Sequence, residues 1–445
     1  MAGDPAPPSP SPPAREAREL SADLYRVVAV LFVVLGHWLI SAVTYDDGRF
    51  GNDYPLEVMP WTRWLTLAFQ VVPVFFLVGG YASTASWADR RAAERRPTDW
   101  VRHRVGTILG PTTAYLVVAL GLVAVLAAVG VGSSPLAFGG WAVAMQLWFV
   151  PVYLVVLAFT PLAEAAHRRW GLRVPAALAL AVAVVDVVAR VADVPAIGAA
   201  NYLLCWAAIY QLGICWRTGT LTGRRALTIA VSGALVVVIL LAFGWYPISM
   251  VGAPGAADQN NFPPTVALLA FGAAQSGALV AAAPAVTRWL RRSRLRRPLA
   301  VVSRNVMALY LWQMVPVVVV ALVAYPAGLL PQPALGSVGW WLLRVGWVAI
   351  LAIVMAAGLG LLWLGRRVFD RALPTIPVPL PAWSAAPLLV VGIAGAVLAL
   401  VPMAVHGFAP GGRFPIIEAA VYVVAVAVLT LTPSTAEAVP RSDVE

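Results

Sequence analysis

The sequence predicts an all-α, polytopic transmembrane helical bundle of about 12 spans, with both termini in the cytoplasm. Three observations lead to this prediction. The 445-residue chain is 61% hydrophobic and 11% charged, and its mean hydropathy is +0.82. Its apolar residues gather in runs of about 20, the length that crosses a bilayer as a helix. Arginine-rich loops alternate with arginine-poor loops. A soluble core does not need this much apolar surface, so a soluble globular protein is excluded.

The predicted spans follow a tail rich in Pro, Ser and Ala. Residues 1–22 contain no apolar stretch and are expected to form a disordered cytoplasmic tail. They are not a signal peptide, because the next apolar run is too long and lacks a cleavage-type ending. The expected spans are about 24–44, 62–86, 104–130, 143–163, 174–192, 199–217, 225–245, 263–287, 301–325, 339–364, 386–404 and 414–432. Residues 433–445 are expected to form a second short cytoplasmic tail.

The loop arginines predict the orientation of these spans. The chain contains no lysine, so all 31 basic residues are arginines. They cluster in the loops after every second span, at 90–102, 168–173, 217–225, 288–297 and 366–371. By the positive-inside rule these loops and both termini lie in the cytoplasm. Arginines placed between apolar runs suit the anionic surface of membrane lipid, so the net charge of +11 does not indicate a nucleic-acid partner.

Arg26 and His37 are the main candidate catalytic residues. Eleven positions apart in the first span, they share one helix face and are separated by roughly 16 Å along the axis. Ionisable side chains at membrane depth are costly and usually mark a pathway or a site. Imidazole is also the usual general base near neutral pH. Taken singly, Arg26 suits an interfacial anchor equally well, and His37 a structural hydrogen-bond donor. Their shared stripe favours chemistry inside a membrane cavity.

Five further side chains in the predicted spans are candidate substrate-binding residues. Trp148 and Tyr153 open the fourth span, where an interfacial aromatic belt is the favoured interpretation and a substrate contact by Tyr153 is the alternative. Asn305, Tyr310 and Gln313 lie in the ninth span. Because Asn305 and Gln313 are eight positions apart, they lie on roughly the same face. We expect that face to point into the bundle, since exposing amides to lipid is costly.

Two other pairs receive structural interpretations. Asp186 and Arg190 are four positions apart in the fifth span, the spacing of an ion pair on one helix face. Cys205 and Cys215 lie in one apolar run, about 15 Å apart along a helix, too far for a disulfide. We interpret both cysteines as small buried apolar residues.

Motifs for metal and nucleotide binding are missing from the sequence. The four histidines are isolated, and no Cys or His pair has zinc-type spacing, so no metal site is predicted. No glycine-rich phosphate loop follows a strand. The glycine pair at 79–80 lies inside a predicted span and indicates close helix packing.

Several segments occur in an order and spacing that resembles the acyltransferase 3 family of bacterial integral-membrane O-acyltransferases. They are the Arg-x10-His of residues 26–37, Phe75–Tyr81, Trp100–Arg104 before Pro111, Leu147–Tyr153 and Ser303–Trp312. The resemblance predicts an acyltransferase domain over 23–372, followed by two additional transmembrane helices in 373–432.

The chain departs from the family pattern at two positions. The family often has Arg-x-x-Arg before the third span, and here Arg104 is followed at that spacing by Thr107. The late segment commonly ends in a histidine, where this chain has Gln313.

The resemblance implies transfer of an acyl group, usually acetyl, from cytoplasmic acyl-CoA to a hydroxyl of an extracytoplasmic saccharide or related acceptor. The expected location is the plasma membrane, and acyl-CoA is a donor substrate and not a permanently bound cofactor. His37 is then expected to be the general base, with Arg26 holding the donor or orienting the site. Arg102 and Arg104 are expected to bind the phosphates of coenzyme A, although arginines at that face are often only topology signals.

A twelve-span secondary transporter of the major facilitator type is the alternative. An even number of spans, cytoplasmic termini and the pair Asp89–Arg90 fit that class. The glycines expected around the pair are Ala85 and Ala92 here, and no second copy occurs in the other half of the chain. A non-catalytic membrane scaffold would not need the stripe that joins Arg26 to His37.

Overall fold

The computed structural model describes residues 20–94, 96–252 and 259–434. Most of the two predicted tails therefore lies outside the described residues. The α-helices are α1 (Leu20–Ile40), α2 (Pro55–Val58), α3 (Thr66–Phe69), α4 (Val72–Ala92), α5 (Pro97–Ala128), α6 (Ser133–Ala144), α7 (Phe149–Ala158), α8 (Thr160–Trp170), α9 (Arg173–Val191), α10 (Pro195–Gly198), α11 (Asn201–Arg217), α12 (Gly223–Ala242), α13 (Val266–Arg292), α14 (Arg296–Arg304), α15 (Val306–Trp312), α16 (Val315–Ala324), α17 (Val338–Leu364), α18 (Arg366–Phe369), α19 (Ala385–His406) and α20 (Ile416–Thr430).

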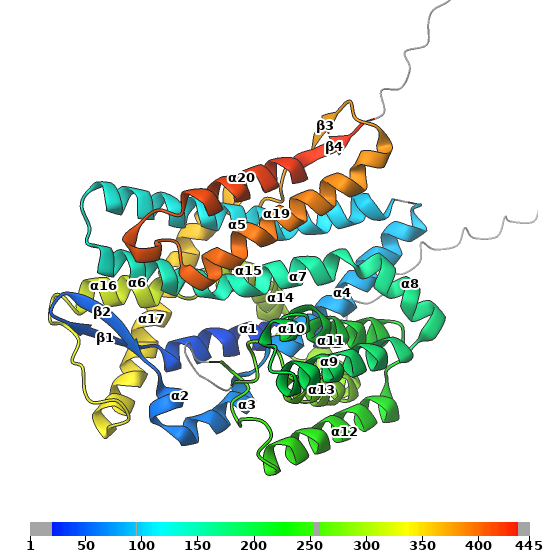
Figure 1. The fold of residues 1–445 in the computed structure, drawn as a ribbon, viewed down its shortest axis with the longest axis horizontal. Coiled ribbons are helices and arrows are strands. Elements are labelled where there is room, and N and C mark those ends of the chain that lie inside the picture. The colour runs from blue at the N-terminus through cyan, green and yellow to red at the C-terminus, as the bar shows by residue number, and fades with distance from the viewer. Residues whose placement is uncertain (1–19, 95, 253–258, 435–445) are drawn as a thin grey trace, which may run out of the picture.

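Short elements connect these helices. The 3-10 helices are η1 (Pro60–Leu65), η2 (Met145–Trp148), η3 (Ala382–Ser384) and η4 (Pro410–Gly412). The strands form two small sheets, an antiparallel hairpin of β1 (Ala42–Asp46) with β2 (Arg49–Asp53) and a parallel pair of β3 (Ile376–Val378) with β4 (Leu431–Pro433). Figure 1 shows the hairpin at one end of the bundle, beside α6.

The predicted all-α polytopic bundle is confirmed. Helices make up 76% of the structure, and eleven helical segments of the described chain are long and apolar enough to cross a membrane. The twelfth predicted span corresponds to α20, which has 15 residues. At 1.5 Å per residue it reaches only about 23 Å, less than the roughly 30 Å of a hydrocarbon core.

Several of the spanning segments are interrupted helices, which sequence hydropathy alone predicts as continuous. The fourth runs through α6, η2 and α7, and the ninth through α15 and α16, with Gln313 and Met314 between them. Pro151 and Pro316 stand in the first turns of α7 and α16. Proline is tolerated at that position because its missing N–H is one that no helix partner would use.

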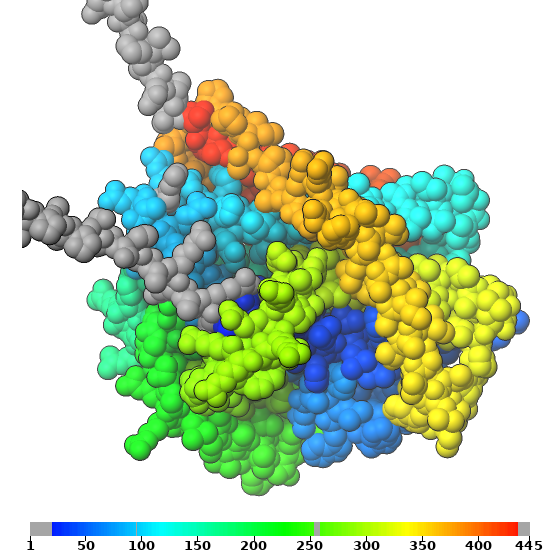
Figure 2. Space-filling view, turned by 180° about the vertical axis from the view of Figure 1, so that it is seen from behind, coloured from blue at the N-terminus to red at the C-terminus, as the bar shows by residue number. Residues whose placement is uncertain are grey.

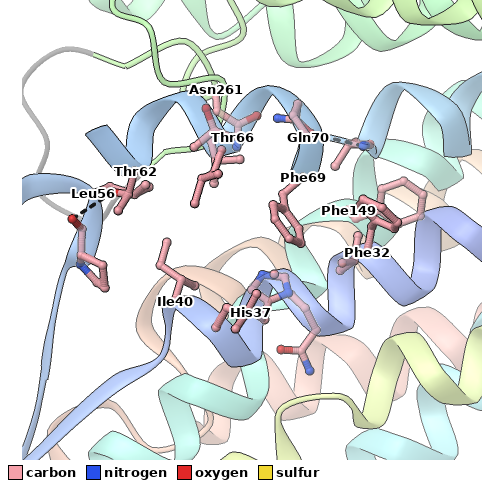
Figure 3. Close-up of a pocket in the computed structure, with 18 of the residues that line it drawn as sticks. Phe32, His37, Ile40, Leu56, Thr62, Thr66, Phe69, Gln70, Phe149 and Asn261 are labelled. Atoms are coloured by element: carbon pink, nitrogen blue, oxygen red, sulfur yellow. Dashed lines mark hydrogen bonds between the residues drawn. The ribbon is translucent and has the colours of Figure 1, made fainter. Parts of the chain in front are cut away.

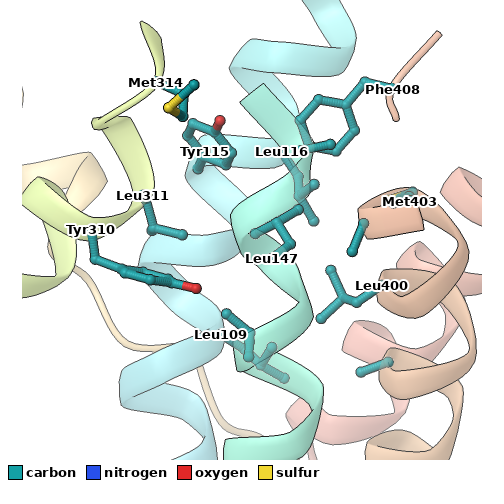
Figure 4. Packing of buried hydrophobic residues seen from close by; sticks show 14 of the residues in the cluster. Leu109, Tyr115, Leu116, Leu147, Tyr310, Leu311, Met314, Leu400, Met403 and Phe408 are labelled. Carbon is teal, nitrogen blue, oxygen red and sulfur yellow. The ribbon is translucent and has the colours of Figure 1, made fainter. Parts of the chain in front are cut away.

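The buried side chains form two large clusters that share one seam. The first, the α5 core, joins α5 and α7 to α15–α17, α19 and α20. Figure 4 shows its centre, where Tyr115 and Leu116 of α5 lie near Leu147 and face Phe408. The second, the α11 core, joins α11 to α4, α9, α12 and α13. Four aromatic side chains pack against both cores: Phe75, Trp148, Phe149 and Tyr153.

The glycine pair at 79–80 brings α4 against α11, as the sequence predicted. A Cβ at Gly80 would lie 2.0 Å from the carbonyl oxygen of Tyr210, and a Cβ at Gly213 would lie 2.0 Å from that of Leu77. Only glycine fits on either side of this crossing, because any side chain would overlap backbone atoms.

The two helices after residue 372 are built into the α5 core. Figure 1 shows α19 and α20 side by side along α5. Phe408 N donates to Gly140 O at 3.0 Å. Arg102 of α5 is buried and donates to the carbonyl oxygens of Leu429 and Leu431, where α20 ends. A cation suits this position because the last carbonyls of a helix lack internal partners and carry partial negative charge.

Both structural interpretations from the sequence are confirmed. Arg190 Nε lies 3.1 Å from Asp186 Oδ1. The other carboxylate oxygen of Asp186 accepts hydrogen bonds from the Tyr246 hydroxyl and the Val266 backbone N–H, each at 2.8 Å, so this buried charge is fully engaged. Cys205 and Cys215 are buried, and neither forms a disulfide.

Candidate active site

His37 lines a cavity of about 200 Å³ between α1 and the segment that precedes α4. Figure 3 shows its ring on one side of the cavity, with Thr66 and Gln70 on the opposite side. In Figure 2, α1 is visible between the segment around α14 and the long α17. The histidine predicted from the sequence to be the base therefore lines a cavity of the bundle.

The walls of this cavity, called the His37 cavity below, are apolar and aromatic. Six of the lining aromatic residues are Phe32, Phe69, Phe75, Trp148, Phe149 and Trp340. No Asp, Glu, Arg or Lys is among its lining residues in the described chain. The polar groups at the walls are imidazole, hydroxyl and amide groups. Apolar walls of this kind lower the local dielectric constant and strengthen each polar interaction made between them.

Gln313 orients the imidazole of His37. Gln313 Nε2 lies 3.1 Å from Tyr310 O, and because a carbonyl oxygen only accepts, the amide NH₂ must face it. The amide oxygen then faces His37 Nδ1, at 3.1 Å. Gln313 Oε1 also only accepts, so neutral His37 carries its proton on Nδ1. Nε2 keeps a free lone pair, as a general base requires.

The break between α15 and α16 is what brings Gln313 to this position. A broken membrane helix leaves carbonyl oxygens that need new donors. Trp38 Nε1 donates to Gln313 O at 2.7 Å, and Gln146 Nε2 donates to Leu311 O at 3.0 Å. The Tyr310 hydroxyl donates in turn to Gln146 O. This network joins α1, η2 and α15 around His37.

Arg26 lies at the other end of α1, in a polar cluster with Asp23 and Ser303. Its NH2 group is 3.3 Å from Asp23 Oδ1 and 2.5 Å from Ser303 Oγ. Ser303 Oγ also donates to Asp23 Oδ1 at 3.1 Å. Eleven residues of helix separate Arg26 from His37, roughly 16 Å. The two residues therefore lie about three helical turns apart, and Arg26 is not among the residues that line the His37 cavity.

Arg104 of α5 lies within electrostatic range of Tyr153, as Arg26 does. Both guanidinium groups are close enough to act electrostatically on the Tyr153 hydroxyl, and Arg104 also acts on Tyr210. Arg104 Nε is buried and has no hydrogen-bond partner within the described chain. Arg104 as a whole is half-buried, and a guanidinium in this position suits the binding of an anion. Tyr153 itself packs against Gly79.

The remaining predicted residues divide between the cavity and the scaffold. Trp148 and Tyr310 line the His37 cavity. Trp148 lies at the seam of the two cores, against Trp206 and Phe262. Asn305 is bound to its own helix through Val301 O at 2.8 Å. Arg102, already paired with α20, is separate from the cluster around Arg104.

A second cavity of about 440 Å³ borders the first at Trp340. Its walls include the β1–β2 hairpin and Arg344 of α17. Arg344 is buried, donates to Ser41 O at 2.6 Å and lies 4.3 Å from the centroid of the Trp340 ring. Charged side chains therefore lie outside the His37 cavity, and none is among the described residues of its walls.

Sequence reasoning missed several residues of the His37 cavity. Thr66 and Gln70 come from the segment before α4, and Asn261 from the loop before α13. Gln146, on η2, is also a cavity residue that the sequence did not predict, although it lies two positions from the predicted Trp148. Gln70 and Gln146 could have been found from the sequence, because each is a polar amide within an apolar run. Asn261 carried no signal, because it lies in a loop where asparagine is ordinary.

Taken together, the fold and the site define a polytopic membrane protein with an imidazole in an apolar cavity and a polar cluster of Arg26, Asp23 and Ser303 at the other end of the same helix. An acyltransferase domain model matches residues 19–367. The chain therefore belongs to the acyltransferase 3 family of integral-membrane O-acyltransferases. The match ends before α19 begins. No curated protein and no solved structure matches the chain at a significant level.

Proposed function

We propose that this protein is a plasma-membrane enzyme that transfers an acyl group, most simply acetyl, from cytoplasmic acyl-CoA to a hydroxyl of an extracytoplasmic saccharide or related acceptor. The observation that carries this proposal is the contact of His37 Nδ1 with Gln313 Oε1 at 3.1 Å. Gln313 holds the proton on Nδ1, and the free Nε2 belongs to a residue that lines a cavity large enough for a hydroxyl-bearing group.

In the proposed step, His37 Nε2 takes the proton of the acceptor hydroxyl as its oxygen attacks the thioester carbonyl carbon. The new C–O bond forms and the C–S bond of acyl-CoA breaks. The leaving thiolate of coenzyme A then takes the proton from the imidazolium, which restores the neutral base. Gln313 stabilises the imidazolium as well, since Nδ1 keeps its hydrogen bond throughout the step.

The cluster of Arg26 and Arg104 is proposed to receive the phosphates of coenzyme A. Guanidinium groups suit phosphate oxygens, and Arg104 has an unpaired buried nitrogen. A donor with phosphates at one end and a thioester at the other fits a site whose charged and basic groups are roughly 16 Å apart on α1. The same role, predicted for Arg102, is less well supported, because Arg102 already binds the end of α20.

The family match favours this function over the secondary transporter that the number of spans also allowed. The function is tested by deleting the gene in its host and comparing glycans, lipids and secreted metabolites by mass spectrometry. We expect one acylated species to disappear and to return on complementation with the wild-type gene, but not with His37→Ala. An unchanged set of acylated species in the deletion strain would contradict the proposal.

A further inference from the structure

The larger of the two cavities has the features of a separate ligand site. It measures about 440 Å³ and shares only Trp340 with the His37 cavity. Its walls come from the β1–β2 hairpin, the segment between α16 and α17, and α17 itself. Figure 1 shows these parts at the same end of the bundle. Gln332 ties the segment to the hairpin, because its amide accepts from Tyr45 N at 2.7 Å and donates to Tyr45 O at 2.9 Å.

Arg344 brings a buried positive charge to the wall of this cavity. Its side chain belongs to a residue that is only 9% exposed, and it forms no ion pair with a carboxylate of the described chain. Its guanidinium carbon lies 4.3 Å from the ring centroid of Trp340 and 5.6 Å from that of Trp347. Such cation–π contacts hold a guanidinium in place but leave its positive charge without a counterion.

Two of the three guanidinium nitrogens of Arg344 are free to bind a ligand. Nη1 donates to Ser41 O, at the end of α1, whereas Nε and Nη2 have no hydrogen-bond partner in the described chain. Neither atom is among the unpaired polar atoms that are closed off from solvent, so a ligand in the cavity can reach them. Capping α1 needs one nitrogen only. The remaining edge presents two N–H groups side by side, the arrangement that pairs with two oxygens of a carboxylate or phosphate.

One further donor lies beside this edge. Tyr325 lines the same cavity and lies within electrostatic range of Arg344. Its hydroxyl has no hydrogen-bond partner in the described chain and is likewise not closed off from solvent. A phenol hydroxyl can donate to an anion that a guanidinium holds.

Two acidic side chains limit the charge that the cavity accepts. Asp46 and Asp53 of the hairpin also line it, and both are exposed. They would repel a second negative charge on the ligand, which the single guanidinium would not offset. We infer that this cavity binds a singly charged oxyanion, a carboxylate or a phosphodiester, through the Nε and Nη2 atoms of Arg344 and the hydroxyl of Tyr325. This ligand site is separate from His37 and does not depend on the acyl transfer proposed above.

Binding is measured by isothermal titration calorimetry on the full-length protein in nonionic detergent, at about pH 8 and constant ionic strength. The probes are benzoate, its uncharged isostere benzamide, and phenyl phosphate, which carries two charges at this pH. We expect benzoate to bind about tenfold more tightly than either of the others. Dihexanoyl phosphatidylglycerol, a soluble lipid with a phosphodiester, is the competitor. Displacement of benzoate indicates that a lipid headgroup can occupy the site, and unchanged benzoate binding indicates a carboxylate ligand.

Variants assign the binding to this cavity. Arg344→Gln removes the charge and should weaken benzoate binding about 10–100-fold. The matched control is Arg49→Gln on β2, which removes the same charge from an exposed position that lines neither cavity and should bind benzoate as the wild type does. Tyr325→Phe keeps the ring beside Trp347 and should weaken binding about threefold to tenfold. It leaves Arg344 in place at the end of α1, so it tests the site even where Arg344→Gln fails to fold.

The results that would overturn the inference are equally specific. Equal binding of benzoate and benzamide would do so, and so would equal losses in Arg344→Gln and Arg49→Gln. Absence of benzoate binding would show that Arg344 only caps α1. Tighter binding of phenyl phosphate than of benzoate would contradict the restriction to one charge. Since none of these measurements uses acyl-CoA, a protein that binds benzoate through Arg344 but transfers no acyl group would contradict only the proposed function.

Discussion

In the proposed mechanism, His37 acts through Nε2 because its Nδ1 is hydrogen-bonded to Gln313. A neutral imidazole has two tautomers, and only the one protonated on Nδ1 leaves Nε2 basic. Where the family commonly has a histidine, this chain has an amide that cannot change its protonation state. The orientation of His37 therefore does not depend on the protonation state of its partner, and in the proposed mechanism this keeps Nε2 available as the base.

Removing the acceptor at Gln313 tests this pairing. In Gln313→Leu the imidazole is free to adopt either tautomer and to rotate, so we expect kcat to fall by about 10–100-fold, as is typical for partners that orient a functional histidine. The KM for acyl-CoA should stay near the wild-type value, because the donor phosphates bind elsewhere. Steady-state kinetics of the purified variant measure both parameters. An unchanged kcat would show that Gln313 does not orient the base.

Arg104 and Arg102 form a matched pair of arginines on α5 with different partners. Arg104→Gln should raise the KM for acyl-CoA about 10–100-fold, because a charge-assisted hydrogen bond contributes roughly 1.5–3 kcal/mol. Arg102→Gln should leave that KM unchanged and lower the thermal unfolding temperature, since it frees the end of α20. The reverse pattern in kinetics and unfolding would place the donor at Arg102.

The residues that could be predicted from the sequence are those that are unfavourable in a membrane or that recur at a helical spacing. His37 and Arg26 are conspicuous because ionisable groups are rare in apolar runs. Gln313 was a candidate for substrate binding, but its pairing with His37 spans 276 positions and follows only from the folded bundle. Arg102 and Arg104 looked equivalent, and only the position of α20 separates them.

At the scale of helices, interruptions in the spanning segments position several residues of the candidate site. The interruption at Gln313 supplies the acceptor for His37, and η2 places Gln146 and Trp148 at the cavity. Helix α19 packs directly on η2 and α7. The two helices beyond the family match therefore support the wall of the cavity from outside, which gives them a structural role in the site.

Helix ends were harder to predict than helix positions. Hydropathy located each span, because the length of apolar runs is set by bilayer thickness. It did not reveal the breaks at η2 and between α15 and α16, where proline and local packing decide the backbone. Hydropathy also predicted a full span for α20. The apolar run at 414–432 is longer than this helix, because its last residues form strand β4.

His167 links α8 to α11 and makes stability depend on pH. Its Nε2 lies 2.8 Å from Thr218 Oγ1 and its Nδ1 lies 3.4 Å from Cys215 Sγ. Burial lowers the pKa of His167 from its usual 6.5, and Glu164 offsets part of this effect. A histidine with a lowered folded-state pKa contributes stability that is complete above the unfolded pKa and is lost as pH falls through the folded pKa.

We therefore expect the thermal unfolding temperature to fall on going from about pH 7.5 to about pH 5. The fall should be smaller in His167→Gln, which keeps polar contacts but does not titrate. Differential scanning fluorimetry at both pH values measures the difference. Equal pH dependence of the two proteins would show that His167 does not contribute to it.

For the whole molecule, the proposed reaction requires that α1 connect two sides of the membrane. Arg26 lies in the polar cluster with Asp23 and Ser303. His37 lines the apolar cavity, near the seam where the two cores meet. The transfer step then occurs within the bundle, between a donor from one side and an acceptor from the other.

Orientation is tested by labelling single introduced cysteines in intact cells. The native Cys205 and Cys215 are buried and should react little. Arg49→Cys in the exposed hairpin should react with a membrane-impermeant maleimide from outside, and Arg294→Cys, between α13 and α14, should react only after the membrane is opened. Labelling of both positions from the same side would contradict the proposed route of the donor.

The most direct measurement of the central claim is acyl transfer by His37→Gln. The variant keeps a hydrogen-bonding side chain of similar polarity and loses only the basic nitrogen. Membranes that contain either protein are incubated with labelled acetyl-CoA and an envelope extract from the deletion strain, and acylated product is quantified. We expect normal insertion and a loss of transfer of about 10²–10⁴-fold, the usual contribution of general-base catalysis. Turnover near the wild-type rate would contradict the account, because His37 would then be only a structural hydrogen-bonding residue.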